Sequence, residues 1–424
     1  MYNQEQTAGY GNSVEFAIEG AVPLKILIVS QYYYPENFRI NDIAAGLVAG
    51  GHQVQVLTGL PDYATSRVPK AYKWRRKRDE VIDGVSVHRV PIIARRHGAA
   101  FRFLNYLSFA VCGRLYARFG KKPEADVIFV YQTSPVFQAM PALTYRKRLG
   151  VPVVLYCCDL WPESLKAGGI GESSRIFSAV RKISADIYRS CDCICVTSRP
   201  FVGYLASVCG VPADKMTYLP QHAEDLYSEI VGQYEDNECI DFLFAGNIGK
   251  VQNVDCILRA AARMDAALPF LVHIVGDGSE LASCRQEAQR LGVTEKVRFH
   301  GRYPLEEMKG FYQMADCFLL TLRGGDFIGK TLPAKSQGYL SVGKPIIAAA
   351  DEAVQEMVAE SGCGTAVPAG DDAALAQAME DVVLHFDRYR EMGMSGRRFY
   401  EAHYARDVFM QRLTGIFADI REKL

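Results

Sequence analysis

Residues 25–30 read Lys-Ile-Leu-Ile-Val-Ser, an apolar run of the length of one β-strand that stops at a loop. An amphipathic stretch follows from Phe38 to Ala49, and after Gly50-Gly51 the chain enters a second apolar run, Val54 to Thr58. This order predicts a strand, a helix and a parallel strand, which together form a βαβ unit. Further strands are expected at 127–131, 152–157 and 193–197, with helices around 138–149 and 173–190 between them.

The same rhythm starts again after a polar, acidic stretch at 223–238. Asp241-Phe-Leu-Phe-Ala245 predicts a strand, and a helix is expected from about Val254. Four more strands are expected, at 270–275, 296–300, 317–320 and 345–349. Strands that alternate with helices in this way predict an α/β fold with doubly wound parallel sheets. The restart predicts two such Rossmann-like domains, joined near 221–240 and facing each other across a ligand-binding cleft.

The composition is that of a globular protein, because 49% of the 424 residues are hydrophobic and 23% are charged. The longest apolar stretch, Phe101 to Gly113, is broken by Arg102, Asn105 and Ser108, so no membrane-spanning segment is expected. Residues 1–23 contain no Lys or Arg and no apolar core. They predict a flexible lead-in and not a signal peptide, and hence a cytoplasmic protein.

The twelve cysteines lie mostly inside apolar runs, which is typical of a reducing compartment. Cys191, Cys193 and Cys195 alternate along one expected strand, where we interpret them as packing residues. A metal site built on them would need a His or a CxxC pair nearby in sequence, and neither is present.

The formal net charge of zero conceals an asymmetry, since the chain up to Pro220 carries +10 and the remainder carries −10. Such a first half suits an anionic partner, either nucleic acid or anionic lipid. Its basic residues concentrate in Lys70 to Arg78 and in Arg95 to Lys122, where they are interleaved with apolar side chains. That mixture favours a segment that lies on an anionic membrane, with a buried helix with solvated Arg ends as the alternative. No nucleic-acid-binding motif accompanies it.

Two glycine-containing loops follow strands of the second half. They read Gly246-Asn-Ile-Gly249-Lys250 and Gly276-Asp-Gly278. Glycine lets backbone amides approach a phosphate, but a tight turn explains each loop equally well. Neither loop is a GxGxxG, so the fingerprint of a nicotinamide cofactor is missing.

Nine short motifs occur in order along the chain. They are Gln31-Tyr-Tyr-Tyr-Pro-Glu-Asn37, Gly51-His-Gln-Val54, Leu60-Pro-Asp-Tyr63, Asp159-Leu-Trp-Pro-Glu-Ser164, Gly246-Asn-Ile-Gly249, Val275-Gly-Asp-Gly278, Phe299-His-Gly301, Ala315-Asp316 and Pro333-Ala-Lys335 through Gly343-Lys-Pro345. Together they resemble bacterial glycosyltransferases of family 4, which have the two-domain GT-B fold. The resemblance is greatest to the branch that builds O-antigen, capsule and exopolysaccharide and that includes fucosamine transferases.

The resemblance implies an acceptor-binding domain at 24–222, a nucleotide-sugar-binding domain at 223–400, and a C-terminal helix at 401–424 that packs back toward the first domain. It implies a retaining enzyme that transfers a sugar from a nucleotide donor, expected to be a UDP-sugar. The acceptor would be a polyprenyl-diphosphate-linked or other glycan, and the protein would be peripheral on the inner face of the plasma membrane. No metal or cofactor is expected, because Lys or Arg and a helix N-terminus would meet the developing negative charge.

The donor-binding residues that the resemblance implies are Gly246, Asn247, Gly249, Lys250, Gly276, Gly278, Gly301, Arg302, Thr331, Leu332, Lys335 and Gln337. Lys330 is implied to be catalytic, because it precedes the helix that opens after Pro333 and can stabilise the leaving diphosphate. The alternative for Lys330 and Lys335 is that both are solvated ends of a surface helix.

The chain departs from the family pattern at its donor carboxylates. The family's Glu-x7-Glu pair falls on Lys330 and Gly338, and the Arg of its Gly-Arg pattern falls on Asn247. A carboxylate-independent variant, a changed donor or lost catalysis would each explain this. The alternatives to a transferase are therefore a catalytically degenerate GT-B protein that binds nucleotide or glycan as a regulatory or assembly partner, and a GT-B sugar-nucleotide epimerase.

On the acceptor side, Asp159 follows an expected strand and is predicted to orient or deprotonate the acceptor hydroxyl. The alternative is that its carboxylate caps the helix that starts near Pro162. Further acceptor candidates are Tyr33, Glu36 and Asn37. Aromatic rings such as that of Tyr33 suit sugar stacking, but loop tyrosines also pack on one another.

Overall fold

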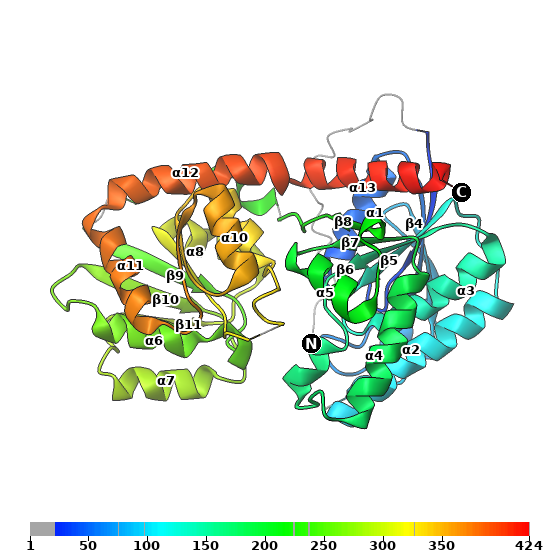
Figure 1. Ribbon diagram of the computed structural model, residues 1–424, viewed down its shortest axis with the longest axis horizontal. Helices are drawn as coiled ribbons and strands as arrows, with labels where there is room; N and C mark the ends of the chain where they lie inside the picture. The colour runs from blue at the N-terminus through cyan, green and yellow to red at the C-terminus, as the bar shows by residue number, and fades with distance from the viewer. Residues whose placement is uncertain are drawn as a thin grey trace. The chain divides into compact units, whose positions relative to one another are not determined.

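The computed structural model describes residues 22–423, apart from residues 75, 97, 224, 236, 237 and 326. The chain forms two compact units (Figure 1). The first contains the residues up to Cys195 together with Cys209–Met216 and Thr414–Leu424, and the second contains Val196–Val208 and Thr217–Leu413. The predicted lead-in at 1–23 lies outside the described residues, except for its last two positions.

The first unit is built on an eight-stranded sheet in the order β3-β4-β2-β1-β5-β6-β7-β8. Its strands are β1 (Lys25–Val29), β2 (Gln53–Gly59), β3 (Asp79–Ile82), β4 (Val85–Val90), β5 (Val127–Gln132), β6 (Val153–Cys157), β7 (Cys193–Val196) and β8 (Met216–Tyr218). The strand β1 pairs in parallel with β2 and β5. Its aliphatic side chains from Ile26 to Val29 are buried, as expected of a central strand covered on both faces.

Helices cover both faces of this sheet (Figure 1). They are α1 (Arg39–Ala49), α2 (Ala99–Phe119), α3 (Met140–Leu149), α4 (Arg175–Ser190) and the second half of α13 (Arg406–Glu422). The helix α5 (Pro200–Cys209) belongs almost entirely to the second unit, as does the first half of α13. The helices α2, α3 and α4 lie on one face, and α1 and α13 on the other. The ring of Phe417 in α13 lies 5.4 Å from that of Phe129 in β5, so the end of the chain completes the core of the first unit.

The hairpin formed by β3 and β4 is absent from the sequence-based expectation. The two strands pair antiparallel around Asp83-Gly84, whose φ angles of 49° and 78° are typical of a tight hairpin turn. β3 is an edge strand with two acidic residues, so its residues lack the continuous apolar run that marks the inner strands.

The second unit contains a six-stranded sheet in the order β11-β10-β9-β12-β13-β14. Its elements are β9 (Ile240–Ala245), α6 (Val254–Arg263), β10 (Phe270–Val275), α7 (Leu281–Arg290), β11 (Val297–Gly301), α8 (Met308–Met314), β12 (Cys317–Thr321), α9 (Lys335–Val342), β13 (Ile346–Ala349), α10 (Glu352–Ser361), β14 (Gly364–Val367), α11 (Asp372–Leu384) and α12 (Phe386–His403). All its strand pairs are parallel. The prediction of two α/β units with parallel sheets is therefore confirmed.

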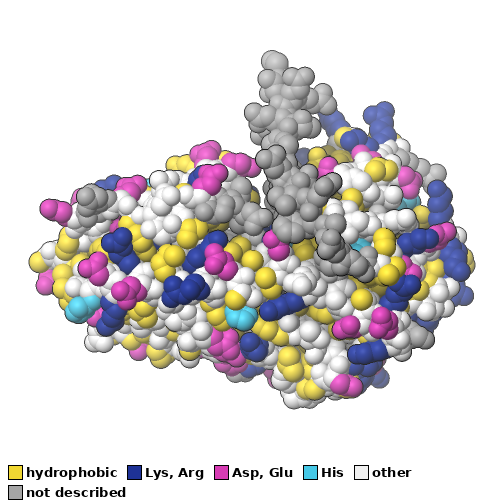
Figure 2. All heavy atoms as spheres, turned by 90° about the horizontal axis from the view of Figure 1, so that it is seen from above, with side chains coloured by type: hydrophobic (Ala, Val, Ile, Leu, Met, Phe, Trp, Pro, Cys, Tyr) yellow, Lys and Arg dark blue, Asp and Glu magenta, His cyan; other side chains and the backbone are white. Residues whose placement is uncertain are grey.

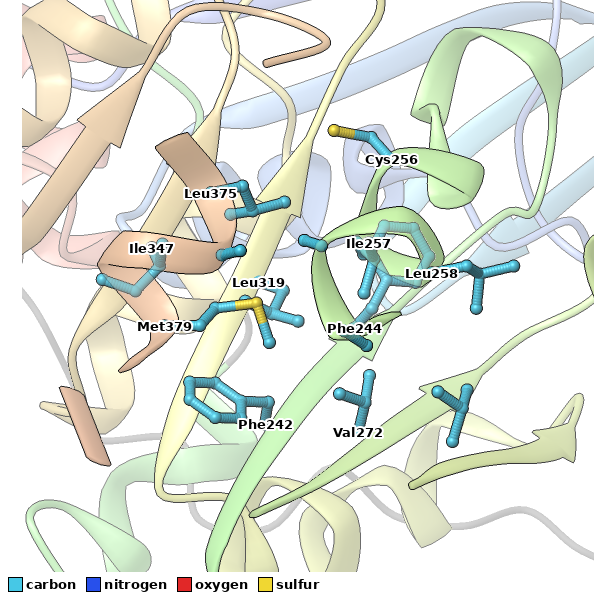
Figure 3. Close-up of a cluster of buried hydrophobic side chains, with 14 of the residues drawn as sticks. Phe242, Phe244, Cys256, Ile257, Leu258, Val272, Leu319, Ile347, Leu375 and Met379 are labelled. Atoms are coloured by element: carbon cyan, nitrogen blue, oxygen red, sulfur yellow. The ribbon is translucent and has the colours of Figure 1, made fainter. Parts of the chain in front are cut away.

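The core of the second unit is formed where helices pack on this sheet (Figure 3). Phe242 and Phe244 of β9 and Leu319 of β12 lie beneath Ile257 of α6 and Met379 of α11. These side chains are all fully buried, which fixes β9 as the central strand. The loops that leave the carboxyl ends of β9 and its neighbours are thus held on a rigid base.

The twelve cysteines are free thiols, and most are buried in the two cores. No group of three or more potential metal ligands gathers among the residues that the structure describes. Within the same residues, no helix combines the length and the apolar character needed to cross a membrane.

Candidate active site

Three glycines stand side by side where β9, β10 and β11 end. The amide of Gly246 donates to the carbonyl of Val275 at 2.9 Å, and the amide of Gly276 donates to the carbonyl of Gly301 at 2.8 Å. A Cβ on Gly276 would lie 1.8 Å from the carbonyl oxygen of Gly246. The two loops are therefore in direct backbone contact, and only glycine fits at position 276.

The next glycine of the second loop is fixed in the same way. A Cβ on Gly278 would lie 2.2 Å from the carbonyl oxygen of Ile248, whose own amide donates to Asp277 at 2.9 Å. The glycines thus satisfy the tight-turn interpretation. They also leave bare backbone at the carboxyl edge of the sheet, which is where ligands bind in folds of this class.

Lys335, the first residue of α9, places an unpaired ammonium against this edge. Its Nζ lies 3.7 Å from the centre of the Phe244 ring and would lie 3.2 Å from a Cβ on Gly246. The residue as a whole is half-buried, but the Nζ atom is shielded from solvent and has no hydrogen-bond partner. Burial lowers the pKa of Lys335 to about 7. A buried cation without a counter-charge is costly, so an anion bound beside Gly246 would be favoured here.

Lys330 is placed differently, because it already has a partner. Its Nζ lies 3.0 Å from each carboxylate oxygen of Glu352, the first residue of α10. The side chains of Lys330 and Glu352 are 25% and 46% exposed. The ammonium that the sequence assigned to the diphosphate is thus held by a carboxylate in this structure.

The other donor candidates surround the glycine loops and the start of α9. Asn247 donates from Nδ2 to Oε1 of Gln252 at 3.0 Å, while Lys250 and Arg302 are exposed. The hydroxyl of Thr331 donates to the carbonyl of Phe327 at 3.4 Å, and Leu332 is buried. The side-chain amide of Gln337 is oriented so that its nitrogen donates to the carbonyls of Pro333 and Ala334. Asn247, Lys250 and Arg302 are therefore the open polar groups of this set.

Gly338, at the position of the family's second carboxylate, lies beside two stacked tyrosines. A Cβ at this position would come no closer than 3.7 Å to the hydroxyl of Tyr312 and 4.0 Å to the ring of Tyr227. The rings of Tyr227 and Tyr312 stack with centroids 4.2 Å apart. Space for the start of a side chain is therefore present, and the missing carboxylate is not explained by crowding at Cβ.

In the first unit, Asp159 follows β6 and accepts a hydrogen bond from Ser134. The Ser134 hydroxyl donates to Oδ2 of Asp159 at 2.7 Å, and the indole of Trp161 donates to Ser134 at 3.1 Å. Burial raises the pKa of Asp159, and the hydrogen bonds from Ser134 oppose that shift. The hydrogen bonds that the Asp159 carboxylate makes with described residues come from Ser134 and not from an amide of the short 3-10 helix Glu163–Gly168, so the helix cap of the alternative is not found.

Glu36 and Asp62 form a buried acidic pair in the loops after β1 and β2. Glu36 accepts the amide of Tyr63, and Asp62 accepts the amide of Arg95 at 2.6 Å and the side chain of Asn105 at 2.8 Å. Burial raises the pKa of Glu36 to about 7 and that of Asp62 to about 6. One carboxylate oxygen of each residue is buried with no hydrogen-bond partner. Asp62 was not among the predicted site residues, although it lies in the quoted Leu60 to Tyr63 motif.

The aromatic residues near this pair differ in exposure. Tyr33 is 5% exposed, and Tyr32 stacks on Phe38 with centroids 5.1 Å apart. Tyr34 is 47% exposed, and Asn37 is exposed. Tyr32 and Tyr33 are thus buried, but the ring contacts of Tyr32 are with Phe38 and Tyr63 and not with the other loop tyrosines. Tyr34 offers an open ring at the carboxyl edge of the first sheet.

Comparisons with known proteins agree with this architecture. The model of the "Glycosyl transferase 4-like domain" matches residues 37–222, and that of "Glycosyl transferases group 1" matches residues 229–399. The putative colanic acid biosynthesis glycosyl transferase WcaI of Escherichia coli is 26% identical over 343 residues, which cover 76% of this chain and 82% of WcaI.

Solved structures give the same fold. Sucrose-phosphate synthase from Thermosynechococcus elongatus superposes with a TM-score of 0.72 at 15% identity, over 95% of this chain and all of that one. Anabaena HepE in complex with UDP-glucose superposes with a TM-score of 0.65 at 13% identity, over 95% of this chain and all of HepE. The two family models together match most of the chain, and they agree with its two α/β units and its glycine loops at the carboxyl edge. The chain therefore belongs to the family 4 glycosyltransferases of the GT-B fold.

Proposed function

We propose that the protein is a retaining glycosyltransferase of bacterial surface polysaccharide biosynthesis that uses a UDP-sugar donor and a lipid-linked glycan acceptor. Binding of a nucleotide donor is supported mainly by the ammonium of Lys335, which is buried beside Gly246 without a hydrogen-bond partner among the described residues. A diphosphate at this edge would supply its counter-charge. The polysaccharide half is supported by WcaI, whose name assigns it to colanic acid biosynthesis.

The choice of uridine is supported by the fold relative HepE, which was solved with UDP-glucose. In this proposal the leaving diphosphate gains negative charge as the glycosidic bond breaks, and Lys335 stabilises that charge. The carboxylates of the family's donor motif are replaced here by Lys330 and Gly338. Retention would then proceed by a front-side displacement, in which the leaving phosphate assists the incoming hydroxyl.

The acceptor half rests on Asp159. Its raised pKa and its hydrogen bond to Ser134 suit a group that orients the acceptor hydroxyl or accepts its proton. Glu36, whose pKa is also raised by burial, lies in a loop at the same edge of the first sheet and is a second group for acceptor hydroxyls.

Attachment to an anionic membrane surface would bring such an enzyme to a lipid-linked acceptor. The outer side of α2 supports it, because Phe103, Leu107, Val111, Leu115 and Phe119 recur every fourth residue and are 42–74% exposed. The cations Arg102, Arg114 and Arg118 lie in the same helix. The opposite side of the first unit, along α13, also carries Lys and Arg side chains (Figure 2). An apolar stripe with cations beside it is the usual composition of a helix at a membrane interface.

A binding protein without catalysis is the second candidate. It is favoured by the ion pair of Lys330 with Glu352. Lys330 stands at the family's first carboxylate position, and its ammonium is already neutralised by this pair. Such a protein would bind the nucleotide through the glycine edge and Lys335 but would not release it from a sugar.

The test is a transfer assay with the purified full chain. UDP-, GDP- and dTDP-linked sugars are offered singly with a bacterial extract of lipid-linked glycans, and the product's anomeric configuration is determined by NMR. We expect transfer from a UDP-sugar with retained configuration, and its loss in Lys335→Ala but not in Lys309→Ala, a matched change at an exposed ion pair. Tight UDP binding without turnover of any donor would establish the binding protein instead.

A further inference from the structure

A groove of about 680 Å³ runs through the helical layer of the first unit, away from the candidate acceptor residues. Side chains of α2, α3 and α4 line it. The lining residues of α2 and α4 come from the last turns of these helices, which lead into the amino ends of β5 and β7. Asp159 and Glu36 follow the carboxyl ends of β6 and β1. The groove therefore lies toward the opposite edge of the sheet.

Four cations and one carboxylate line the groove. Arg148 donates to the carbonyls of Ala117 and Gly120 at the end of α2, and the carboxylate, Asp186, is paired with Arg189. Cations are common near helix C-termini because they complement the helix dipole, and Arg118, Lys147 and Arg148 all lie in last turns. Arg148 also has hydrogen-bond partners, whereas the other three form a group of cations with no hydrogen bond or ion pair among the described residues.

That group consists of Arg114, Arg118 and Lys147. Within the described part of the chain, none of the three has a hydrogen bond or an ion pair. Arg118 has one ring contact, with its guanidinium 5.5 Å from the centre of the adjacent Phe119 ring. Arg114 and Lys147 come from different helices, so their charges approach the groove from two of its sides. Three unneutralised cations around one groove are the complement of a phosphate.

Apolar side chains lie beside these cations. Phe119 and Ile183 are 74% and 39% exposed, and Met140, Leu143 and Ile187 complete the apolar lining. Phe119 also ends the exposed stripe of α2. A free sugar phosphate would gain nothing from these side chains, whereas a lipid presents a phosphate directly next to hydrocarbon.

We propose that this groove binds the phosphate of an anionic phospholipid headgroup while the stripe of α2 lies in the membrane interface. A volume of this size accommodates one small headgroup. The 21 residues of α2 span about 30 Å, so the helix joins the groove at its C-terminal end to Asn105 and the acceptor-side loops near its N-terminal end. The inference rests on the membrane attachment proposed above, and it assigns that attachment to defined residues.

The test compares two double variants of the full chain that remove the same charge. Arg114→Ser with Lys147→Ser empties the groove of two cations. Arg298→Ser with Arg412→Ser removes two exposed arginines of the second unit that have no ion pair with any described residue. Binding to phosphatidylcholine vesicles that contain about 30% phosphatidylglycerol is measured by co-sedimentation. The lipid concentration is raised in roughly threefold steps, and the concentration at half-maximal binding is compared between variants. Because each basic residue near such a surface contributes about 1 kcal/mol, we expect the groove variant to bind about 10- to 30-fold more weakly and the control about as well as the wild type.

Three results would overturn the proposal. Equal weakening in both variants would mean that overall charge and not the groove attracts the membrane. Binding of inorganic phosphate to the wild type but not to the groove variant, with both proteins bound equally well by acidic vesicles, would identify a site for free phosphate. Absence of wild-type binding to acidic vesicles would remove the membrane altogether. Because no sugar is transferred in this experiment, its failure leaves the proposed transferase activity untouched, and that activity is tested separately.

Discussion

Nζ of Lys330 lies at the same distance, 3.0 Å, from both carboxylate oxygens of Glu352. The pair joins the segment before α9 to the first residue of α10, whose φ of 31° lies in the left-handed region. Partly exposed ion pairs of this kind stabilise a fold by about 1 kcal/mol or less, so stability alone gives little reason for the arrangement. Two roles for Lys330 can be separated by mutating each partner.

Lys330→Ala is expected to lower kcat about 10²- to 10³-fold with a smaller change in the donor KM, if the ammonium stabilises the departing diphosphate. Glu352→Gln is the matched control, because it breaks the ion pair and keeps the cation. Steady-state kinetics with the active UDP-sugar measure both. Unchanged kcat in Lys330→Ala would show that Lys330 has no role in catalysis and only pairs with Glu352.

Lys335→Met is expected to stabilise the ligand-free protein while weakening UDP binding about 10- to 100-fold, the effect of losing one hydrogen bond to a charged group. The pKa of Lys335 is lowered from 10.5 to about 7, so the unfolded state binds more protons between these values. This lysine therefore makes stability rise with pH from about 7 to about 10. The gain in Tm of Lys335→Met over the wild type should be larger at pH 6 than at pH 9. A gain that does not vary with pH would contradict the burial of a titrating ammonium.

Ser134→Ala is expected to move the acidic limb of the pH profile of kcat/KM to higher pH. The hydrogen bonds from Ser134 oppose the rise in the pKa of Asp159 that burial causes, so removing the hydroxyl raises that pKa further. Asp159→Asn should abolish the limb and lower the rate about 10²-fold or more. An acidic limb that persists in Asp159→Asn would assign it to another group, with Glu36 the next to examine.

Transfer is expected to survive chelation. The sequence contains no Asp-x-Asp pair of the kind that holds a divalent ion against a diphosphate, and the proposal gives that charge to lysines. Initial rates are measured with about 5 mM EDTA, an excess over any bound divalent ion, and with Mg²⁺. The two rates should be equal. Complete loss in EDTA with recovery in Mg²⁺ or Mn²⁺ would overturn this expectation.

Trp74 is expected to report membrane contact by fluorescence. Its side chain is 91% exposed in the basic segment Lys70 to Arg78, whereas the only other tryptophan, Trp161, is 6% exposed. Tryptophan favours the membrane interface, so emission should shift to shorter wavelength on acidic vesicles. The shift should disappear in Trp74→Phe and persist in Trp161→Phe. A shift that persists in Trp74→Phe would show that this segment stays in water.

The regular strands were predictable because each inner strand is a continuous apolar run. β10 was expected at 270–275 and is found there, and β9 differs by one residue. The hairpin of β3 and β4 does not follow from apolar runs, because an edge strand needs fewer apolar residues than an inner one; its sequence signal is the turn at Asp83-Gly84. Helix starts after prolines were less exact, since α9 begins at Lys335 and not at Pro333.

The candidate site was less predictable than the fold, because it depends on contacts between distant segments. The steric need for Gly276 arises from Gly246, thirty residues earlier in the chain, and no local pattern contains it. The counter-ion of Lys330 and the hydroxyl that meets Asp159 come from other loops in the same way. The acidic pair of Glu36 and Asp62 could have been found from sequence, since both follow neighbouring parallel strands.

The packing of Phe417 on Phe129 has a consequence for biosynthesis. The two residues are separated by about 290 residues, which a ribosome adds in roughly 15 to 60 s at about 5–20 residues per second. Throughout that time the part of the first sheet around Phe129 lacks the cover that α13 gives it. The nascent protein therefore exposes apolar surface around Phe129 until α13 leaves the exit tunnel, which makes it a natural client for a ribosome-associated chaperone.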